Sequence, residues 1–224
     1  LLSDLNTAFS GNYNNSHTGD VIITNTVGVS IAELTTLDNS KAGTLKPTLI
    51  TDTASILATN TNYVKGNQAV KLSTAHNLSQ LKDINNSTTG DITLNTNSVE
   101  LNGYSADIVA ALEGTLKGPG SGTGYSGNVT VTDHISFENL SKIYTSGTIT
   151  YSKIKDSVTN MISWLNSNSN TNLGSKELII SGNYLLSRYY WPIILHLLGN
   201  QSFKTKFLSR YKLTLRTYYQ WELS

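Results

Sequence analysis

Apolar and polar positions follow the same pattern three times between Val21 and Met161. In each copy, an alternating run typical of a β-strand precedes a segment in which leucine and isoleucine recur as on one face of a helix. The helical segments contain the matched residues Leu34, Leu81 and Leu140, whose spacing is that of a supersecondary repeat. The alternating runs are 21–24, 70–73 and 129–132, and the helical segments are 29–37, 77–84 and 135–143.

Local signals predict where the first helix of each repeat begins and ends. Ser30 followed by Glu33 has the sequence of a capping box, in which each residue accepts a hydrogen bond from the backbone of the other. A glycine follows each helix, at 43, 90 and 147, and we expect it to take the positive φ that stops a helix. Beyond the glycine, the segments 91–94 and 148–151 alternate like half-buried strands.

A second helix is expected in every repeat. Asp52 and Asp156 follow the glycine of their repeat at the same interval, and this position suits a helix N-cap. In the middle repeat the comparable segment starts later, at Asp107, which indicates an insertion of about eight residues after Gly90. Insertions in repeat proteins commonly form loops on one face, often the binding face. Each repeat is therefore predicted to run strand, helix, strand, helix.

The predicted fold class is α/β, with these short repeats stacked as an elongated solenoid, because a unit this small cannot bury its apolar face alone. The side chains at the opposite helical face, Thr35, Lys82 and Ser141, should tolerate truncation. The predicted core is the stacked helical face, made of Leu34, Leu37, Leu81, Ile84, Leu140 and Ile143.

Composition favours an extracellular setting. Charged residues make up 14% of the chain, against a usual fraction of about 25%, and threonine, asparagine, serine and glycine take their place. Cysteine is absent, so neither disulfides nor thiolate metal sites contribute. Such a composition is typical of secreted or surface proteins of bacteria. The chain opens without methionine or a basic segment, so any signal peptide is expected to lie outside it.

The charge pattern divides the chain near residue 183. Residues 1–183 carry 10 lysines, no arginine and 14 acidic residues, whereas 184–224 carry three lysines, three arginines and one acidic residue, together with six of the 12 tyrosines. Three interpretations of this basic-aromatic tail stay open: a membrane- or nucleic-acid-binding module, a cap on the repeats, or a segment that is not a selected sequence. The predicted parts are a lead-in or partial repeat at 1–20, the repeat array at 21–161, an Asn/Ser-rich linker at 162–183, and the tail.

No catalytic motif emerges from the sequence. The four histidines, at 17, 76, 134 and 196, have no partners at metal-ligand spacing. We interpret Asp133 and His134 as a helix-start residue and a surface residue. Residues 122–127 match G-x-G-x-x-G, but they lead into a strand, whereas a dinucleotide loop follows a strand and opens a helix. We therefore predict no enzyme activity, and no catalytic, cofactor-binding or metal-binding residues.

Pairs of threonines raise one alternative, an ice- or carbohydrate-binding protein. Five Thr-x-Thr pairs would each place two hydroxyls on one side of a strand, because strand side chains alternate with period two. Their separations are irregular, however, and threonine also favours half-exposed strands for its β-propensity alone. The pairs start at Thr24, Thr51, Thr59, Thr130 and Thr148.

The combination of a β-run ending in threonine, a helical x-x-L-x-x-I segment, a Gly-Thr-Ile-Thr strand and an Asp-Thr-Ala or Asp-Ser-Val helix start resembles the repeats of very large secreted bacterial surface proteins and adhesins, which accompany repeats-in-toxin segments. The resemblance covers 21–161. It implies a passive extracellular scaffold or adhesive surface. The partners we consider are neighbouring repeats of the same chain and surface glycans or other cell-surface components. Contact with a membrane or with nucleic acid is expected only if the tail at 184–224 is a binding module. The calcium-binding nonapeptide of such proteins is absent from this chain.

Overall fold

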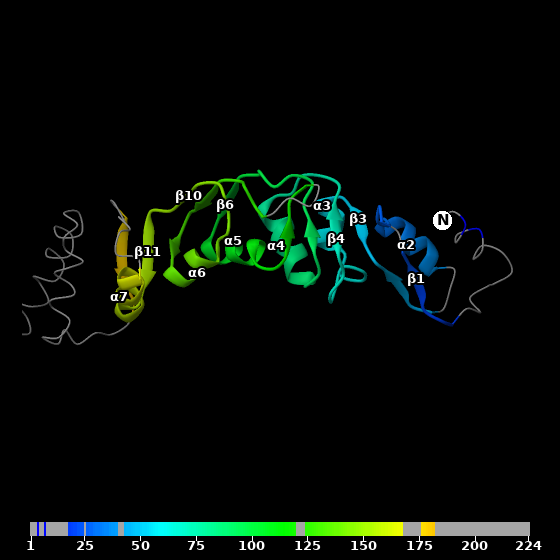
Figure 1. Cartoon of the computed structure of the whole chain (residues 1–224), viewed down its shortest axis with the longest axis horizontal. Helices are drawn as coiled ribbons and strands as arrows, with labels where there is room; N and C mark the ends of the chain where they lie inside the picture. Colours follow the sequence, from blue (N-terminus) through cyan, green and yellow to red (C-terminus); the bar gives the residue numbers. More distant parts are fainter. Residues whose placement is uncertain are drawn as a thin grey trace, which may run out of the picture. The chain divides into compact units, whose positions relative to one another are not determined.

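The computed structural model describes residues 4, 7, 18–24, 26–39, 43–119, 124–167 and 176–181 (Figure 1). Over these ranges it is a mixed α/β fold in which all paired strands are parallel. The helices are α2 (Ile31–Asp38), α3 (Ala54–Thr59), α4 (Leu78–Ser87), α5 (Ser105–Leu112), α6 (Phe137–Lys142) and α7 (Val158–Ser167). The strands are β1 (Val21–Ile23), β2 (Leu45–Pro47), β3 (Ile50–Asp52), β4 (Val70–Leu72), β5 (Ile92–Thr93), β6 (Leu101–Gly103), β7 (Leu116–Lys117), β8 (Val129–Val131), β9 (His134–Ile135), β10 (Ile149–Thr150), β11 (Lys153–Asp156) and β12 (Glu177–Ile180).

The chain divides into two compact bodies. The first comprises the described parts of 1–132 together with 141–150, and the second comprises 133–140 with the described parts of 151–224. The predicted alternation of strands and helices holds in all three repeats, with two short strands between the helices of each. Helix α7 and strand β12 extend into the predicted linker at 162–183. The basic-aromatic tail and most of the lead-in lie outside the described residues.

A four-stranded sheet in the first body links the first two repeats in the order β3-β4-β5-β7. Its register aligns Ile50, Val70, Ile92 and Leu116, which follow one another at nearly equal intervals along the chain. Ile50, Val70 and Ile92 are fully buried. Since side chains alternate along a strand, the next residue of each strand lies on the outer face of the sheet. A bridge between Val29 and Ile50 continues the ladder backwards.

Two further sheets in the first body repeat this parallel arrangement. Strands β6, β8 and β10 form one sheet, in which Leu101 pairs with Val129 and Val129 with Ile149. Strands β1 and β2 form the other, with Val21 opposite Leu45. Both members of the pair between β6 and β8 are completely buried. Each sheet therefore turns one apolar side toward the core.

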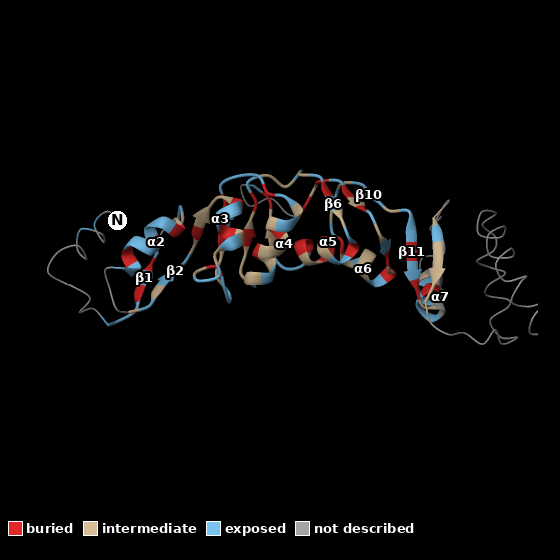
Figure 2. Ribbon diagram, turned by 180° about the vertical axis from the view of Figure 1, so that it is seen from behind, coloured by how far each residue is buried: buried red, intermediate tan, exposed pale blue. Residues whose placement is uncertain are grey.

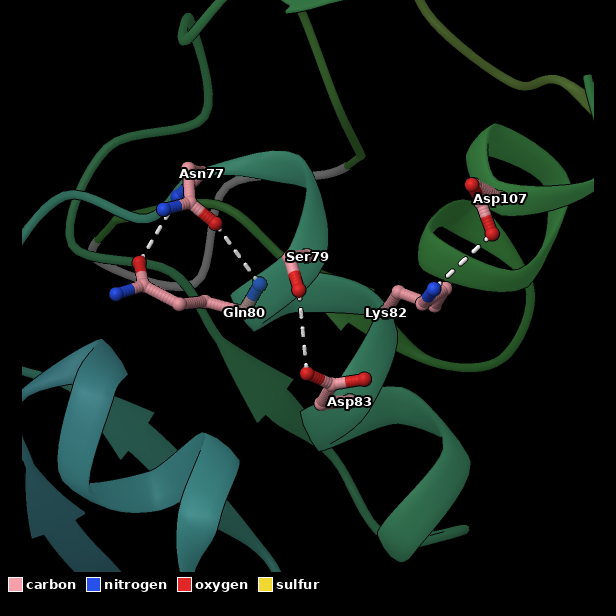
Figure 3. Close-up of polar contacts among 6 residues, drawn as sticks. All are labelled: Asn77, Ser79, Gln80, Lys82, Asp83 and Asp107. Carbon is pink, nitrogen blue, oxygen red and sulfur yellow. Dashed lines mark hydrogen bonds and ion pairs between the residues drawn. The ribbon is translucent and has the colours of Figure 1, made fainter. Parts of the chain in front are cut away.

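Helices α3, α4 and α5 pack in sequence, α3 on α4 and α4 on α5, and their buried residues are red in Figure 2. Leu81 and Ile84 of α4 are fully buried. Asn77 and Gln80 form a capping box at the start of α4, and Lys82 forms a 3.0 Å ion pair with Asp107 of α5 (Figure 3). The helices are thus joined by an apolar contact and a half-buried ion pair.

The predicted helix start and core are largely confirmed. Ser30 Oγ accepts a hydrogen bond from Glu33 N at 3.3 Å, and Ser30 N donates to Glu33 Oε2 at 2.8 Å, which is the predicted capping box. Five of the six predicted core residues are buried, and Leu140 is half-buried. Thr35 and Ser141 are exposed as expected. The buried five are Leu34, Leu37, Leu81, Ile84 and Ile143.

The role predicted for the glycines at 43, 90 and 147 is wrong. Within the described residues, positive φ occurs at four other glycines, for example Gly66 and Gly114. A Cβ at Gly90 would lie 2.5 Å from backbone atoms of Asn67 and Gln68, and one at Gly147 would lie 2.6 Å from the carbonyl of Gly127. These glycines are needed because an earlier segment of the backbone passes too close for any side chain.

The N-cap role predicted for Asp52 is also wrong. Thr53 is the N-cap of α3, and its side chain accepts a hydrogen bond from Ile56 N. Asp52 Oδ2 instead accepts from the backbone N–H of Ile31, the first residue of α2, at 3.0 Å. Its Oδ1 accepts from Thr53 N at 2.8 Å. The carboxylate therefore satisfies amide groups at the starts of two helices at once.

Asp156 departs from its predicted role in the same way. Ser157 Oγ accepts from Asn160 N at 3.1 Å at the start of α7, while Asp156 Oδ2 accepts from Phe137 N at 2.9 Å. In the middle repeat, α5 starts at Ser105, so Asp107 lies inside the helix and Gly103 occupies the position of Asp52. The insertion before β6 is consequently about four residues and not about eight.

The second body contains the sheet β9-β11-β12, in which Ile154 pairs with Ile135 on one side and with Leu178 on the other. The rings of Phe137 and Trp164 stack with their centroids 4.3 Å apart and their planes 19° apart. Ile135 and Ile154 are fully buried. The same parallel pairing across an apolar interior therefore recurs here.

Candidate functional site

The sequence-derived candidates do not assemble into a site within the described ranges. No group of three or more potential metal ligands lies together there, and no described helix combines the length and apolarity needed to cross a membrane. His134 is exposed on β9, opposite Lys153. Asp133 precedes this strand and does not start a helix, because α6 begins at Phe137. Residues 124–127, the described part of the G-x-G-x-x-G match at 122–127, lead into β8, as predicted.

A polar face formed by strands β6, β8 and β10 is the candidate binding site. The register places Asn102 opposite Thr130 and Thr130 opposite Thr150, and all three point away from the buried side of the sheet. Further along, Thr132 N donates to Gly103 O at 2.9 Å, so Thr132 lies beside Tyr104. Strand alternation puts both on the same side as the first three. We call these five residues the neutral face.

The five residues of the neutral face include an exposed aromatic ring and no carboxylate, amine or imidazole, while the exposed carboxylate of Glu100 lies two residues before Asn102 and, by strand alternation, on the same side. Tyr104 is 64% exposed, and its backbone is extended, with φ −71° and ψ 146°. The side chains of Asn102, Thr130, Thr132 and Thr150 make no hydrogen bond to any other residue that the structure describes. Amide and hydroxyl groups both donate and accept hydrogen bonds, so this face can bind a ligand rich in hydroxyls.

Several threonine hydroxyls elsewhere in the first body are used internally. Thr51 Oγ1 donates to Val27 O at 2.8 Å, and Thr59 Oγ1 donates to Ser55 O at 3.1 Å. Thr88 Oγ1 donates to Gln68 O at 2.6 Å. Thr145 Oγ1 donates to Gly127 O at 2.7 Å. The hydroxyls of the neutral face therefore differ from those that stabilise the repeats.

The outer face of the other large sheet has a different character. Its row runs Thr51, Lys71, Thr93 and Lys117 across β3, β4, β5 and β7. Lys117 forms an ion pair with Asp91, whereas Lys71 is exposed and makes no ion pair or hydrogen bond with the described residues. Lysines thus alternate with threonines here, and we call this row the lysine face.

A buried histidine–tyrosine pair lies outside every sequence-derived prediction. His76 is 5% exposed and lies just before α4, and its Nε2 is 3.3 Å from the hydroxyl of Tyr125. The Tyr125 hydroxyl donates to Val99 O at 2.6 Å, so its oxygen accepts from His76 Nε2–H. The other ring nitrogen, Nδ1, is buried and has no hydrogen-bond partner among the residues that the structure describes. The two residues lie far apart in the sequence, which is why spacing could not reveal the pair.

Burial decides the protonation of this pair. It lowers the pKa of His76 to about 4 and raises the pKa of the Tyr125 phenol, because both charged forms would lose their water. Both groups are therefore neutral near pH 7, and the tyrosine joins the start of α4 to the segment before β6. We assign the pair a structural role, since it is almost inaccessible to a substrate.

Comparison with protein family models, curated proteins and solved structures gives no match for this chain.

Proposed function

We propose that this chain is a non-catalytic repeat segment of a larger bacterial surface protein. In this proposal the repeats stack as an elongated solenoid outside the cell and serve as a stalk that carries an adhesive face. The observation that carries the proposal is the parallel ladder through Ile50, Val70, Ile92 and Leu116, whose members recur at nearly equal intervals along the chain. A chain that returns to the same register at each turn builds a one-dimensional stack.

Equivalent polar bonds in different repeats support the stacked arrangement. Thr88 Oγ1 donates to a carbonyl of the preceding turn and accepts from Gly90 N, and Thr145 bonds in the same way with Gly147 N. Asp52 and Asp156 likewise hold the helix before their own strand. Such matched contacts between neighbours are what a repeat array requires.

The adhesive part of the proposal rests on the neutral face, which presents hydroxyl, amide and phenol groups that the fold itself does not use. A flat ice-binding threonine lattice is less well supported, because Lys71 and Lys117 interrupt the threonines of the lysine face. The insertion before β6 also borders the neutral face, and insertions in repeat proteins often mark the binding side.

Surface accessibility tests this proposal. Antibodies raised against the chain should label intact cells of the bacterium that produces it, and brief protease treatment of intact cells should remove the label. A cytosolic protein of the same cells provides the control for lysis, because it should resist the protease treatment of intact cells. Labelling that appears only after the cells are permeabilised would contradict an extracellular role.

A further inference from the structure

The end of strand β6 departs from the equivalent positions in the other two repeats. The first repeat has Thr51-Asp52-Thr53 at the end of β3, and the third has Lys155-Asp156-Ser157 at the end of β11. In both, the aspartate binds the start of an earlier helix and the next hydroxyl caps the following helix. The middle repeat has Asn102-Gly103-Tyr104 instead.

The middle repeat therefore lacks both the aspartate and the capping hydroxyl at the end of β6. Gly103 has no carboxylate, and the Cδ2 atom of Leu78 lies 2.4 Å from where its Cβ would be. Tyr104 occupies the N-cap position of α5, yet its side chain makes no capping hydrogen bond. Serine, threonine, asparagine and aspartate stabilise a helix at this position, and tyrosine does not. A local rule broken without a visible structural gain is typical of a functional position.

What the middle repeat has in place of the cap is an exposed ring beside free polar groups. Tyr104 is 64% exposed and lies two residues beyond Asn102, on the same side of the strand. Thr132, the residue after the end of β8, lies next to it, and Thr130 of β8 lies next to Asn102. A tyrosine ring is amphipathic, with an apolar body and a polar tip. The face thus combines a flat apolar surface with donors and acceptors around it.

Resting on the proposed adhesive role, we infer that the neutral face binds a neutral polysaccharide. The Tyr104 ring stacks against the C–H face of one pyranose, while Asn102, Thr130 and Thr132 exchange hydrogen bonds with its hydroxyls. An uncharged polymer is favoured because the neutral face has no cationic side chain and the exposed carboxylate of Glu100 beside it repels acidic polymers. An acidic glycan would find its counter-charge on the lysine face. A protein partner is disfavoured, since a stable protein interface needs about 800 Å² per partner around an apolar centre, and this face offers one ring.

Affinity electrophoresis of the full chain tests the inference. Native gels are cast with hydroxyethyl cellulose, laminarin, dextran or galactomannan, and in parallel with alginate as an acidic polymer. We expect at least one neutral polymer to retard the chain in a concentration-dependent manner, and alginate to retard it less. Migration unchanged in all four neutral gels, or retardation by alginate alone, would overturn the inference.

Replacing the aromatic ring by a helix cap separates binding from folding. Tyr104→Thr should weaken retention at least tenfold while raising the thermal midpoint by about 2 to 4 °C, because threonine caps α5. Tyr104→Phe should keep retention within threefold, since the ring remains. Tyr144→Thr is the matched control, because Tyr144 is 75% exposed but precedes β10, at the other end of the sheet.

Undiminished retention of Tyr104→Thr would overturn the inference, as would equal losses in Tyr104→Thr and Tyr144→Thr. Failure of polysaccharide binding would leave the surface location untouched, because cell labelling measures that location independently. A cytosolic location would instead overturn the proposed function whatever the gels show. The two tests therefore fail separately.

Discussion

The buried carboxylate of Asp156 accepts a hydrogen bond from the backbone N–H of Phe137, with 2.9 Å between Oδ2 and N. Phe137 is the first residue of α6, and Asp156 ends strand β11. The first amides of a helix lack intrahelical partners and carry partial positive charge. The bond therefore ties the first helix of a repeat to the strand just before its second helix, and Asp52 makes the same bond to Ile31.

Removing either carboxylate should destabilise the fold. Asp156→Ala and Asp52→Ala are each expected to lower the free energy of unfolding by about 1.5 to 3 kcal/mol, because charge-assisted hydrogen bonds are lost and helix amides lose their acceptor. Urea denaturation followed by circular dichroism measures this. Glu100→Ala, at an exposed residue, is the control and should change stability by less than about 0.5 kcal/mol. Equal stability of all three variants would show that these bonds do not stabilise the fold.

The core of α4 can be separated from its polar side by adjacent substitutions. Leu81 is fully buried, so Leu81→Ala should cost about 2 to 5 kcal/mol through lost burial and a cavity. Lys82→Ala removes only the half-buried ion pair with Asp107 and should cost about 1 kcal/mol or less. Denaturant titrations of both variants compare them directly. Similar losses would contradict the assigned helical register.

Acid should weaken the fold through His76. Its pKa is about 4 in the folded chain and about 6.5 when unfolded, so the unfolded chain takes up the proton first as the pH falls. The stabilising contribution is complete above pH 6.5, decreases between pH 6.5 and 4, and amounts to at most about 3 kcal/mol. As the pH falls across this window, we expect the unfolding free energy of the native chain to decrease relative to that of His76→Phe. A difference that is the same at pH 7 and pH 4 would contradict this.

Periodicity predicted the α/β class and most of the strands and helices, because each repeat carries its own local signals. Leu34, Leu81 and their helical neighbours reveal one face by spacing, and the Ser30–Glu33 capping box is a contact between residues three apart. Such patterns depend on the chain's nearest neighbours in sequence. They can therefore be interpreted before any tertiary contact is known.

Contacts between residues far apart in the sequence could not be predicted in the same way. Asp52 looked like an N-cap by position, but its partner Ile31 belongs to the preceding helix and only the register of β3 brings them together. Gly90 looked like a helix stop, whereas the close backbone at Asn67 and Gln68 is what requires it. The His76–Tyr125 pair has no sequence signal, because a buried histidine and an exposed one look alike in a polar chain.

The neutral face was partly within reach of the sequence. Thr130 and Thr150 belong to threonine pairs that alternation placed on one side of a strand. The missing element was Tyr104, since the comparison of Asp107 with Asp52 shifted the middle repeat by about four residues. Once β6 fixes the alignment, Tyr104 stands where the other repeats carry a capping hydroxyl.

The central proposal is that the repeats stack in parallel register. Spin–spin distances along the four-stranded ladder test it most directly. The chain has no cysteine, so nitroxides can be attached only at introduced pairs, combining Thr51→Cys with Lys71→Cys, Thr93→Cys or Lys117→Cys. Adjacent strands lie about 4.8 Å apart, so frozen-solution electron paramagnetic resonance should show the strongest dipolar broadening for 51/71. Broadening should weaken for 51/93 and be smallest for 51/117, at about 14 Å between backbones. Equal broadening in all three pairs, or none for 51/71, would contradict the stacked arrangement.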